Sequence, residues 1–279
     1  MGIPIYLVDA FTQSAYRGNP AAVCVLGSRA DEEWMQQVAA EINLSETAFV
    51  WPSGDRYQLR WFTPKAEVDL CGHATLAAAH VLWERGMLQH EHAAAFDTHS
   101  GLLQVKRGLE GWMVMDFPSL PPTAGSSQAL QRALRLDRYA YAGGNGMDLI
   151  VEVESEEVLL ALDPDFELLA KLPARGVIVT CRSASRPYDF KSRAFFPAIG
   201  VNEDPVTGSA HCALAPYWAA KLGITEMLAY QASERGGELR VRVADNRVAI
   251  EGQAVTVLRG ELSERASAHS SETRGDTTL

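Results

Sequence analysis

The chain has 279 residues, of which 47% are hydrophobic and 22% charged, and its formal net charge at pH 7 is -10. This composition is typical of a globular protein of one or two domains, and the acidic excess argues against a nucleic-acid partner. No run of 18 apolar residues predicts a membrane span, and four scattered cysteines without a CxxC pair indicate a reducing compartment, so we expect a cytoplasmic protein with no membrane partner.

The first third of the chain predicts strands that alternate with helices. Residues 3–11 predict a buried strand, and "AAVCVL" at 21–26 predicts a second strand after the turn "RGNP". Residues 31–42 have helical periodicity behind an aspartate that can cap the helix. Two more strands, "SETAFVWP" and "YQLRWFTP", lead to "GHATLAAAHVLWERG" at 72–86, a helix that runs from one glycine to another.

The segment "FPSLPPTAGSS" breaks this periodic pattern. Residues 117–127 are therefore expected to link an N-terminal half-domain, 1–116, to a C-terminal half-domain, 128–252. Within the second half-domain, strands are predicted at "DLIVEVES", "RGVIVTCR", "SRAFFPAIG" and "ELRVRVADNRVAIEG", and a helix at "DPDFELLAKL". Residues 253–262 predict a last strand that can return to the N-terminal half-domain, and residues 263–279 predict a disordered tail.

Two long segments repeat the same order of strand, proline, acidic loop, glycine, helix and glycine. They are "RWFTPKAEVDLCGHATLAAAHVLWERG" and "RAFFPAIGVNEDPVTGSAHCALAPYWAAKLG". The corresponding residues are Arg60 and Arg193, Pro64 and Pro197, Gly72 and Gly208, and Gly86 and Gly223. The repeat predicts an α+β protein of two related half-domains, and sites are commonly found between such units.

Each repeat places a glycine, Gly72 or Gly208, at the start of a helix. Unpaired backbone N–H groups and the positive end of the helix dipole make such a start suitable for an anion. Two starts that converge could hold one carboxylate-bearing small molecule from both sides. Both glycines could instead serve only tight turns, but His73 and Ser209 stand in matching places and favour a binding role.

Sequence motifs for cofactors and activated nucleophiles are missing. No GxxxxGK[ST] occurs, and "GGNG" at 143–146 lacks the full dinucleotide fingerprint. "TGSAH" differs from the GxSxG nucleophile motif because Thr207 and His211 stand where glycines are needed. No histidine or cysteine spacing fits a metal site, so we expect neither a cofactor nor a metal.

The segment "NLSETAFV" at 43–50 contains a candidate acid/base group. Glu46 is followed by Ala48, Phe49 and Val50, and a carboxylate in an apolar cleft has a raised pKa that suits proton transfer near neutral pH. A capping glutamate at the entrance of a strand is the alternative, and spacing alone leaves both interpretations open.

Four segments, "RGNPAAV", "NLSETAFV", "WFTPKAEVDLCGHATLAAAHVL" and "NEDPVTGSAHCAL", together resemble the PhzF-like family of phenazine biosynthesis over about residues 1–262. The resemblance implies the diaminopimelate epimerase-like fold, in which each of two pseudosymmetric halves is a mostly antiparallel sheet wrapped around a central helix. It also implies a cofactor-independent isomerase, a homodimer, whose site for a small carboxylated substrate lies between the halves.

The same resemblance implies roles for individual residues. Glu46 matches the family's proton-transferring glutamate, and His73, Asp204 and Ser209 match its supporting polar residues. Four substrate-binding positions follow at the helix starts: Cys71, Gly72, Thr207 and Gly208. In the characterised phenazine branch, the enzyme isomerises trans-2,3-dihydro-3-hydroxyanthranilate by moving a hydrogen between ring carbons.

Two alternatives to the isomerase are considered. Diaminopimelate epimerase uses two cysteines on opposite faces of its substrate, and here Cys71 occupies the first position but Thr207 occupies the second, which argues against a two-thiol racemase or epimerase. A non-catalytic binding protein could use the same cleft, although it would not need the acid/base set of Glu46, His73 and Asp204.

Overall fold

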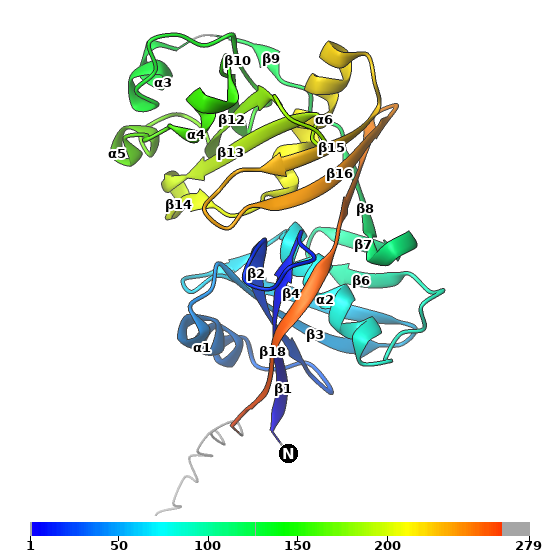
Figure 1. Ribbon diagram of the computed structural model, residues 1–279. Coiled ribbons are helices and arrows are strands. Elements are labelled where there is room, and N and C mark those ends of the chain that lie inside the picture. Colours follow the sequence, from blue (N-terminus) through cyan, green and yellow to red (C-terminus); the bar gives the residue numbers. More distant parts are fainter. Residues whose placement is uncertain (1, 126, 264–279) are drawn as a thin grey trace, which may run out of the picture.

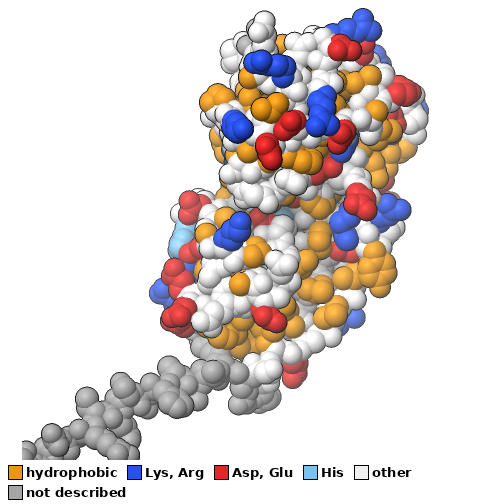
Figure 2. Space-filling model, turned by 90° about the vertical axis from the view of Figure 1, so that its left-hand side faces the viewer, with side chains coloured by type: hydrophobic (Ala, Val, Ile, Leu, Met, Phe, Trp, Pro, Cys, Tyr) orange, Lys and Arg blue, Asp and Glu red, His pale blue; other side chains and the backbone are white. Residues whose placement is uncertain are grey.

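The structure is a computed structural model that describes residues 2–125 and 127–263. Figure 1 shows two halves, one above the other, joined by long strands that run between them. Among the described residues, no helix combines the length and the apolar character needed to cross a bilayer. On the face drawn in Figure 2, acidic and basic side chains are interspersed over both halves.

The N-terminal half is a mostly antiparallel sheet. Its elements are β1 (Ile3–Ala10), β2 (Asn19–Val25), α1 (Glu32–Ile42), β3 (Glu46–Ser53), β4 (Arg56–Phe62), β5 (Glu67–Val68), α2 (Gly72–Glu84), β6 (Ala94–Thr98), β7 (Gly101–Arg107), a 3₁₀ turn (Leu109–Gly111) and β8 (Met113–Pro118). The strands pair in the order β1-β2-β3-β4-β6-β7-β8, and only β2/β3 and β4/β6 are parallel.

The C-terminal half repeats this topology. Its elements are β9 (Thr123–Ala124), α3 (Gln128–Ala133), β10 (Tyr141–Gly144), β11 (Asp148–Glu152), α4 (Glu156–Leu160), α5 (Phe166–Leu169), β12 (Gly176–Arg182), β13 (Phe190–Phe196), a 3₁₀ turn (Pro197–Ile199), β14 (Val201–Asp204), α6 (Gly208–Leu222), β15 (Glu226–Gln231), β16 (Gly237–Ala244) and β17 (Arg247–Gly252). The order is β10-β11-β12-β13-β15-β16-β17, with β11/β12 and β13/β15 parallel. The predicted α+β class with two pseudosymmetric halves is confirmed.

One ion pair recurs in both halves and marks the repeat. Arg60 on β4 bonds Glu67 on the returning strand β5, and Arg193 on β13 bonds Glu203 on β14 through Nε and Nη2 at 2.8 and 2.9 Å. Each pair closes the short hairpin that leads into the central helix. The matched arginines of the sequence repeat therefore hold equivalent positions.

The central helices α2 and α6 are enclosed by their sheets. In α2, Leu76, Leu82 and six further apolar residues are buried, so this helix is apolar on every side. Burial of each large aliphatic side chain contributes about 1.5–3 kcal/mol. Gly86 and Gly223, with φ of +66° and +71°, follow the two helices in the left-handed conformation that stops a helix.

The two sheets form one network of 18 strands. β8 pairs with β17 across the halves, and β18 (Ala254–Leu262) returns to pair with β1 (Figure 1). The segment 117–127 contains the end of β8 and all of β9, which pairs with β10. The domain boundaries stay a prediction, and the predicted tail beyond residue 263 lies outside the described residues.

The element predictions were least accurate near the start of the C-terminal half. The expected helix at "DPDFELLAKL" is a single turn, Phe166–Leu169, because Asp165 caps its start and Pro173 follows shortly after. The short helices α3 and α4, of 6 and 5 residues, were not predicted, because neither is long enough for a clear period. The hairpin β6–β7 of the N-terminal half was not predicted either.

Candidate active site

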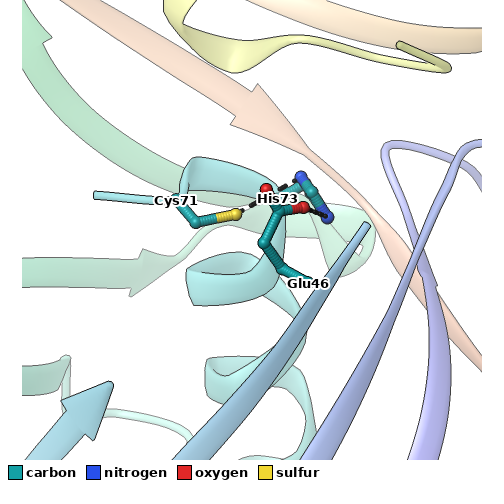
Figure 3. A group of neighbouring side chains, drawn as sticks. All are labelled: Glu46, Cys71 and His73. Carbon is teal, nitrogen blue, oxygen red and sulfur yellow. Dashed lines mark hydrogen bonds and ion pairs between the residues drawn. The ribbon is translucent and has the colours of Figure 1, made fainter. Parts of the chain in front are cut away.

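Glu46 stands at the first position of β3, at the border between the two halves. Its side chain is 20% exposed, and its Oε2 lies 3.3 Å from Nε2 of His73 (Figure 3). No hydrogen bond to this buried oxygen meets the usual geometry among the described residues. Glu46 and His73, which the sequence placed in one site, are therefore neighbours.

Burial sets the proton affinities of this pair. It raises the pKa of the Glu46 carboxyl, although hydrogen bonds from Ser45 and Cys71 oppose that rise. Burial also lowers the pKa of His73, which the charge of Asp204 partly offsets. A carboxylate whose pKa is raised towards neutrality is suited to accept a proton from carbon and to return it.

The other edge of the His73 ring has two polar neighbours. Its Nδ1 lies 3.5 Å from the Cys71 sulfur and 3.3 Å from Nδ2 of Asn19. Burial raises the pKa of Cys71 well above the ordinary value, so its sulfur carries one proton, which either Glu46 or the ring can accept. Nε2, on the opposite edge of the ring, faces Glu46.

The donor atoms of Glu46, Cys71 and His73 lie within 4.8 Å of one another, as a metal site would require. However, the thiol approaches Nδ1 of the ring and the carboxylate approaches Nε2, so the two contact opposite edges of the imidazole (Figure 3). The carboxylate and the thiol therefore lie against different nitrogens of one imidazole. The absence of a metal stays a prediction.

Asn19 is a site residue that the sequence interpretation missed. It begins β2 and is fully buried, and its Nδ2 donates to Oδ1 of Asp204 and to the backbone oxygen of Val206, both at 2.9 Å. It thereby joins His73, the second residue of α2, to the loop that enters α6. The only signal was its place in "RGNPAAV", one of the segments that carry the resemblance.

Asp204 lies on the C-terminal side of this contact. Besides the bond from Asn19, its carboxylate accepts a hydrogen bond from the Thr207 hydroxyl. Gln231, a second residue that was missed, accepts from the Thr207 backbone N–H at 2.9 Å and donates to the Asp204 backbone oxygen at 2.8 Å. Burial raises the pKa of Asp204, and His73 opposes that rise.

The starts of the two central helices are open towards a ligand. Their N-cap residues, Cys71 and Thr207, make no side-chain capping hydrogen bond among the described residues. A Cβ placed on Gly72 would meet no atom within 4 Å, and one on Gly208 would reach only the Phe11 ring at 3.7 Å. Backbone N–H groups at both starts are thus available to an anion.

Ser209 has different neighbours from those expected. Its Oγ accepts a hydrogen bond at 3.1 Å from Nη2 of Arg175, and Arg175 forms a double hydrogen bond with the buried Asp148. The structure therefore places Ser209 beside a guanidinium on the C-terminal half, apart from the contacts between Glu46 and His73. No motif in the sequence indicated Arg175.

The chain was compared with known proteins. The family model described as "Phenazine biosynthesis-like protein" matches residues 8–260. The chain belongs to this family. A protein of Halalkalibacterium halodurans named "Uncharacterized isomerase" is 54% identical over 94% of this chain and 99% of its own length.

Solved structures agree with this family assignment. The crystal structure of a PhzF-family protein of Enterococcus faecalis has a TM-score of 0.89 at 43% identity and covers 95% of this chain and 100% of that one. A hydroxyproline epimerase of Agrobacterium vitis has a TM-score of 0.62 at 11% identity over 93% of this chain and 92% of that one, which shows a shared fold alone.

Proposed function

We propose that the protein is a cofactor-independent isomerase of a small carboxylated metabolite, with Glu46 as the proton-transferring group. The observation that carries this proposal is the buried Glu46 carboxylate, with its raised pKa, 3.3 Å from His73 at the border of the two halves. The name "isomerase" of the relative from Halalkalibacterium halodurans and the family match support the reaction class.

The reaction is a transfer of one proton between two carbons of the same molecule. Glu46 takes the proton, the C–H electron pair moves into the unsaturated, carboxylated system, and Glu46 returns the proton to a different carbon. Backbone N–H groups at Gly72 and Gly208 stabilise the anionic charge that develops. His73, whose Nε2 lies 3.3 Å from Oε2 of Glu46, keeps the carboxylate oriented.

The site is asymmetric, which favours a single base. The strand registers pair Phe49 with Arg60 and Val179 with Arg193, so Glu46 corresponds to Gly176 in the other half. Thr207 likewise corresponds to Cys71. A racemase needs acid/base groups on both faces of its substrate, and the C-terminal half has no side chain at the position equivalent to Glu46.

The test is deuterium incorporation from D₂O into trans-2,3-dihydro-3-hydroxyanthranilate and a panel of other unsaturated carboxylic acids, followed by mass spectrometry. Wild type should incorporate deuterium into at least one compound, and Glu46→Gln should reduce the rate by about 10²- to 10⁴-fold. Glu41→Gln, an exposed helical glutamate, is the matched control.

Three outcomes would contradict the proposal. Incorporation by Glu46→Gln at nearly the wild-type rate would remove the role of this residue. A thermal shift of the wild type without any exchange would favour a binding protein. Inversion of a stereocentre, detected by chiral chromatography of amino acids after incubation, would favour a racemase or epimerase.

A further inference from the structure

Arg175 precedes β12 and is held in one orientation by three neighbours. Asp148 accepts from its Nε at 2.9 Å and from its Nη2 at 2.6 Å, and Ser209 accepts from Nη2 at 3.1 Å. The Phe196 ring lies below the guanidinium, 5.2 Å from Cζ. A guanidinium fixed in this way can bind an anion with little further loss of side-chain conformational entropy.

One edge of this guanidinium remains unused. Nη1 makes no hydrogen bond to the part of the chain that the structure describes, and the Arg175 side chain is 32% exposed, whereas the Asp148 side chain is 1% exposed. The buried carboxylate thus satisfies one edge and leaves the Nη1 edge accessible. If Arg175 served only to neutralise Asp148, its additional contact with Ser209 at the start of α6 would not be needed.

The pseudosymmetry locates Arg175 relative to the proposed base. By the strand registers and the matched helix starts, Ser45 corresponds to Arg175 and His73 corresponds to Ser209. In the N-terminal half, Ser45 contacts His73, with Ser45 Oγ 3.5 Å from His73 Nε2. Arg175 and Ser209 therefore form the equivalent contact on the opposite half.

Gly176, which follows Arg175 in the chain, explains why the C-terminal half does not carry a second base. A Cβ on Gly176 would lie 2.1 Å from Cδ1 of Phe196 and 2.8 Å from the Phe195 backbone oxygen, so no side chain fits there. The place that holds the acid Glu46 in one half holds a phenylalanine ring with an arginine stacked on it in the other.

We propose that Arg175 and Ser209 bind the substrate carboxylate and so fix the direction in which the substrate lies. This inference rests on the proposed function. The carboxylate accepts from Nη1 of Arg175, from the Ser209 hydroxyl and from backbone N–H groups at the start of α6, and the carbon that loses its proton points towards Glu46. The substrates are then small unsaturated acids with the carboxylate at the end away from the reacting C–H bond.

The test compares anthranilate with its uncharged amide, anthranilamide, by isothermal titration calorimetry. The two probes differ little in shape, so a preference for the acid reports recognition of the carboxylate. Wild type should bind anthranilate about tenfold or more tightly than the amide, because hydrogen bonds to charged groups are the stronger ones.

Three variants locate the preference. The double variant Arg175→Met with Asp148→Asn, which avoids an unpaired buried carboxylate, should lose it. Arg182→Met, the same substitution at an exposed arginine, should keep it. Circular dichroism and thermal melting confirm that each variant is folded. Ser209→Ala, which retains Arg175 and Asp148, should weaken the preference for anthranilate, and it replaces the double variant as the test if that variant does not fold.

The outcomes separate the two proposals. A wild type without preference for anthranilate, or without binding, would overturn the assignment of Arg175. So would an undiminished preference in the folded double variant or, if that variant does not fold, in Ser209→Ala. If Arg175 passes this test while Glu46→Gln still exchanges deuterium, the proposed reaction fails and the carboxylate site stands.

Discussion

Nδ2 of Asn19 lies 2.9 Å from Oδ1 of Asp204, so a buried amide of the N-terminal half is bonded to a carboxylate of the C-terminal half. The same amide contacts His73, which in turn faces Glu46. A single side chain thereby sets the separation between the proposed base and the start of α6.

Asn19→Ala should impair both stability and exchange. Loss of the amide leaves the Asp204 carboxylate and the Val206 carbonyl without this donor, which we expect to cost about 1–3 kcal/mol of unfolding free energy. The deuterium-exchange rate should fall at least tenfold, about the effect of 1.4 kcal/mol, because His73 loses a fixed neighbour. Urea denaturation and the exchange assay measure the two effects. Asn246→Ala in an exposed turn is the control, and wild-type exchange in Asn19→Ala would contradict the assigned role.

As the pH is lowered, the deuterium-exchange rate should begin to fall at a higher pH than it would with a solvent-exposed glutamate as the base. Glu46 accepts a proton only when it is ionised, and burial raises its pKa above the ordinary 4.5, so the active form is lost before a solvent-exposed glutamate would be protonated. A rate profile from pH 4 to 8 measures this limb. Burial also raises the pKa of Asp204, so Asp204→Asn is needed to assign the limb. A limb at or below 4.5 in wild type would be inconsistent with a buried base.

His211 should make the fold sensitive to mild acid. It is fully buried, its Nδ1 bonds the Thr207 backbone oxygen at 2.8 Å, and burial lowers its pKa to about 4. The unfolded chain takes up this proton near pH 6.5, so the folded state loses stability as the pH falls from 6.5 towards 4, by about 3 kcal/mol in total.

His211→Gln should flatten this part of the stability profile. Urea denaturation at several pH values measures the slope for wild type and variant. His92→Gln, at an exposed position, is the control and should follow the wild-type slope. Equal slopes for wild type and His211→Gln would show that another group causes any acid sensitivity.

Of two glycine-to-alanine substitutions, Gly72→Ala should affect ligand binding and Gly176→Ala should affect stability. Gly72→Ala places a methyl group in open space at the start of α2, so stability should be retained while anthranilate binding weakens. Gly176→Ala forces Cβ to 2.1 Å from the Phe196 ring and should cost about 1–3 kcal/mol. Thermal melting and calorimetry distinguish the two, and tight anthranilate binding by Gly72→Ala would argue against a ligand at this helix start.

The parts of the fold that could be predicted depend on local periodicity. The helix from Gly72 to Gly86, its partner in the second repeat and the early strands have clear patterns. The role of Glu46 as an acid/base group stays a prediction. The short helices α3 and α4 are only 6 and 5 residues long, too short to establish a period.

The contacts that complete the site could not be predicted, because they join distant parts of the chain. Asn19 bonds Asp204, which is 185 residues away, and Arg175 bonds Asp148 across two paired strands. Such contacts follow from sheet pairing, which one sequence does not specify. Ser209 matched the repeat correctly, but its guanidinium partner lies on a segment without any recognisable motif.

The pairing of β18 with β1 has a consequence for the order of synthesis. β1 lies between β2 and β18, and β18 is formed by residues 254–262. A ribosome that has released the first 120 residues has therefore produced an N-terminal half whose first strand still has one unpaired edge. This half becomes complete only when translation has passed the whole C-terminal half, so the first half to be made is the last to be finished.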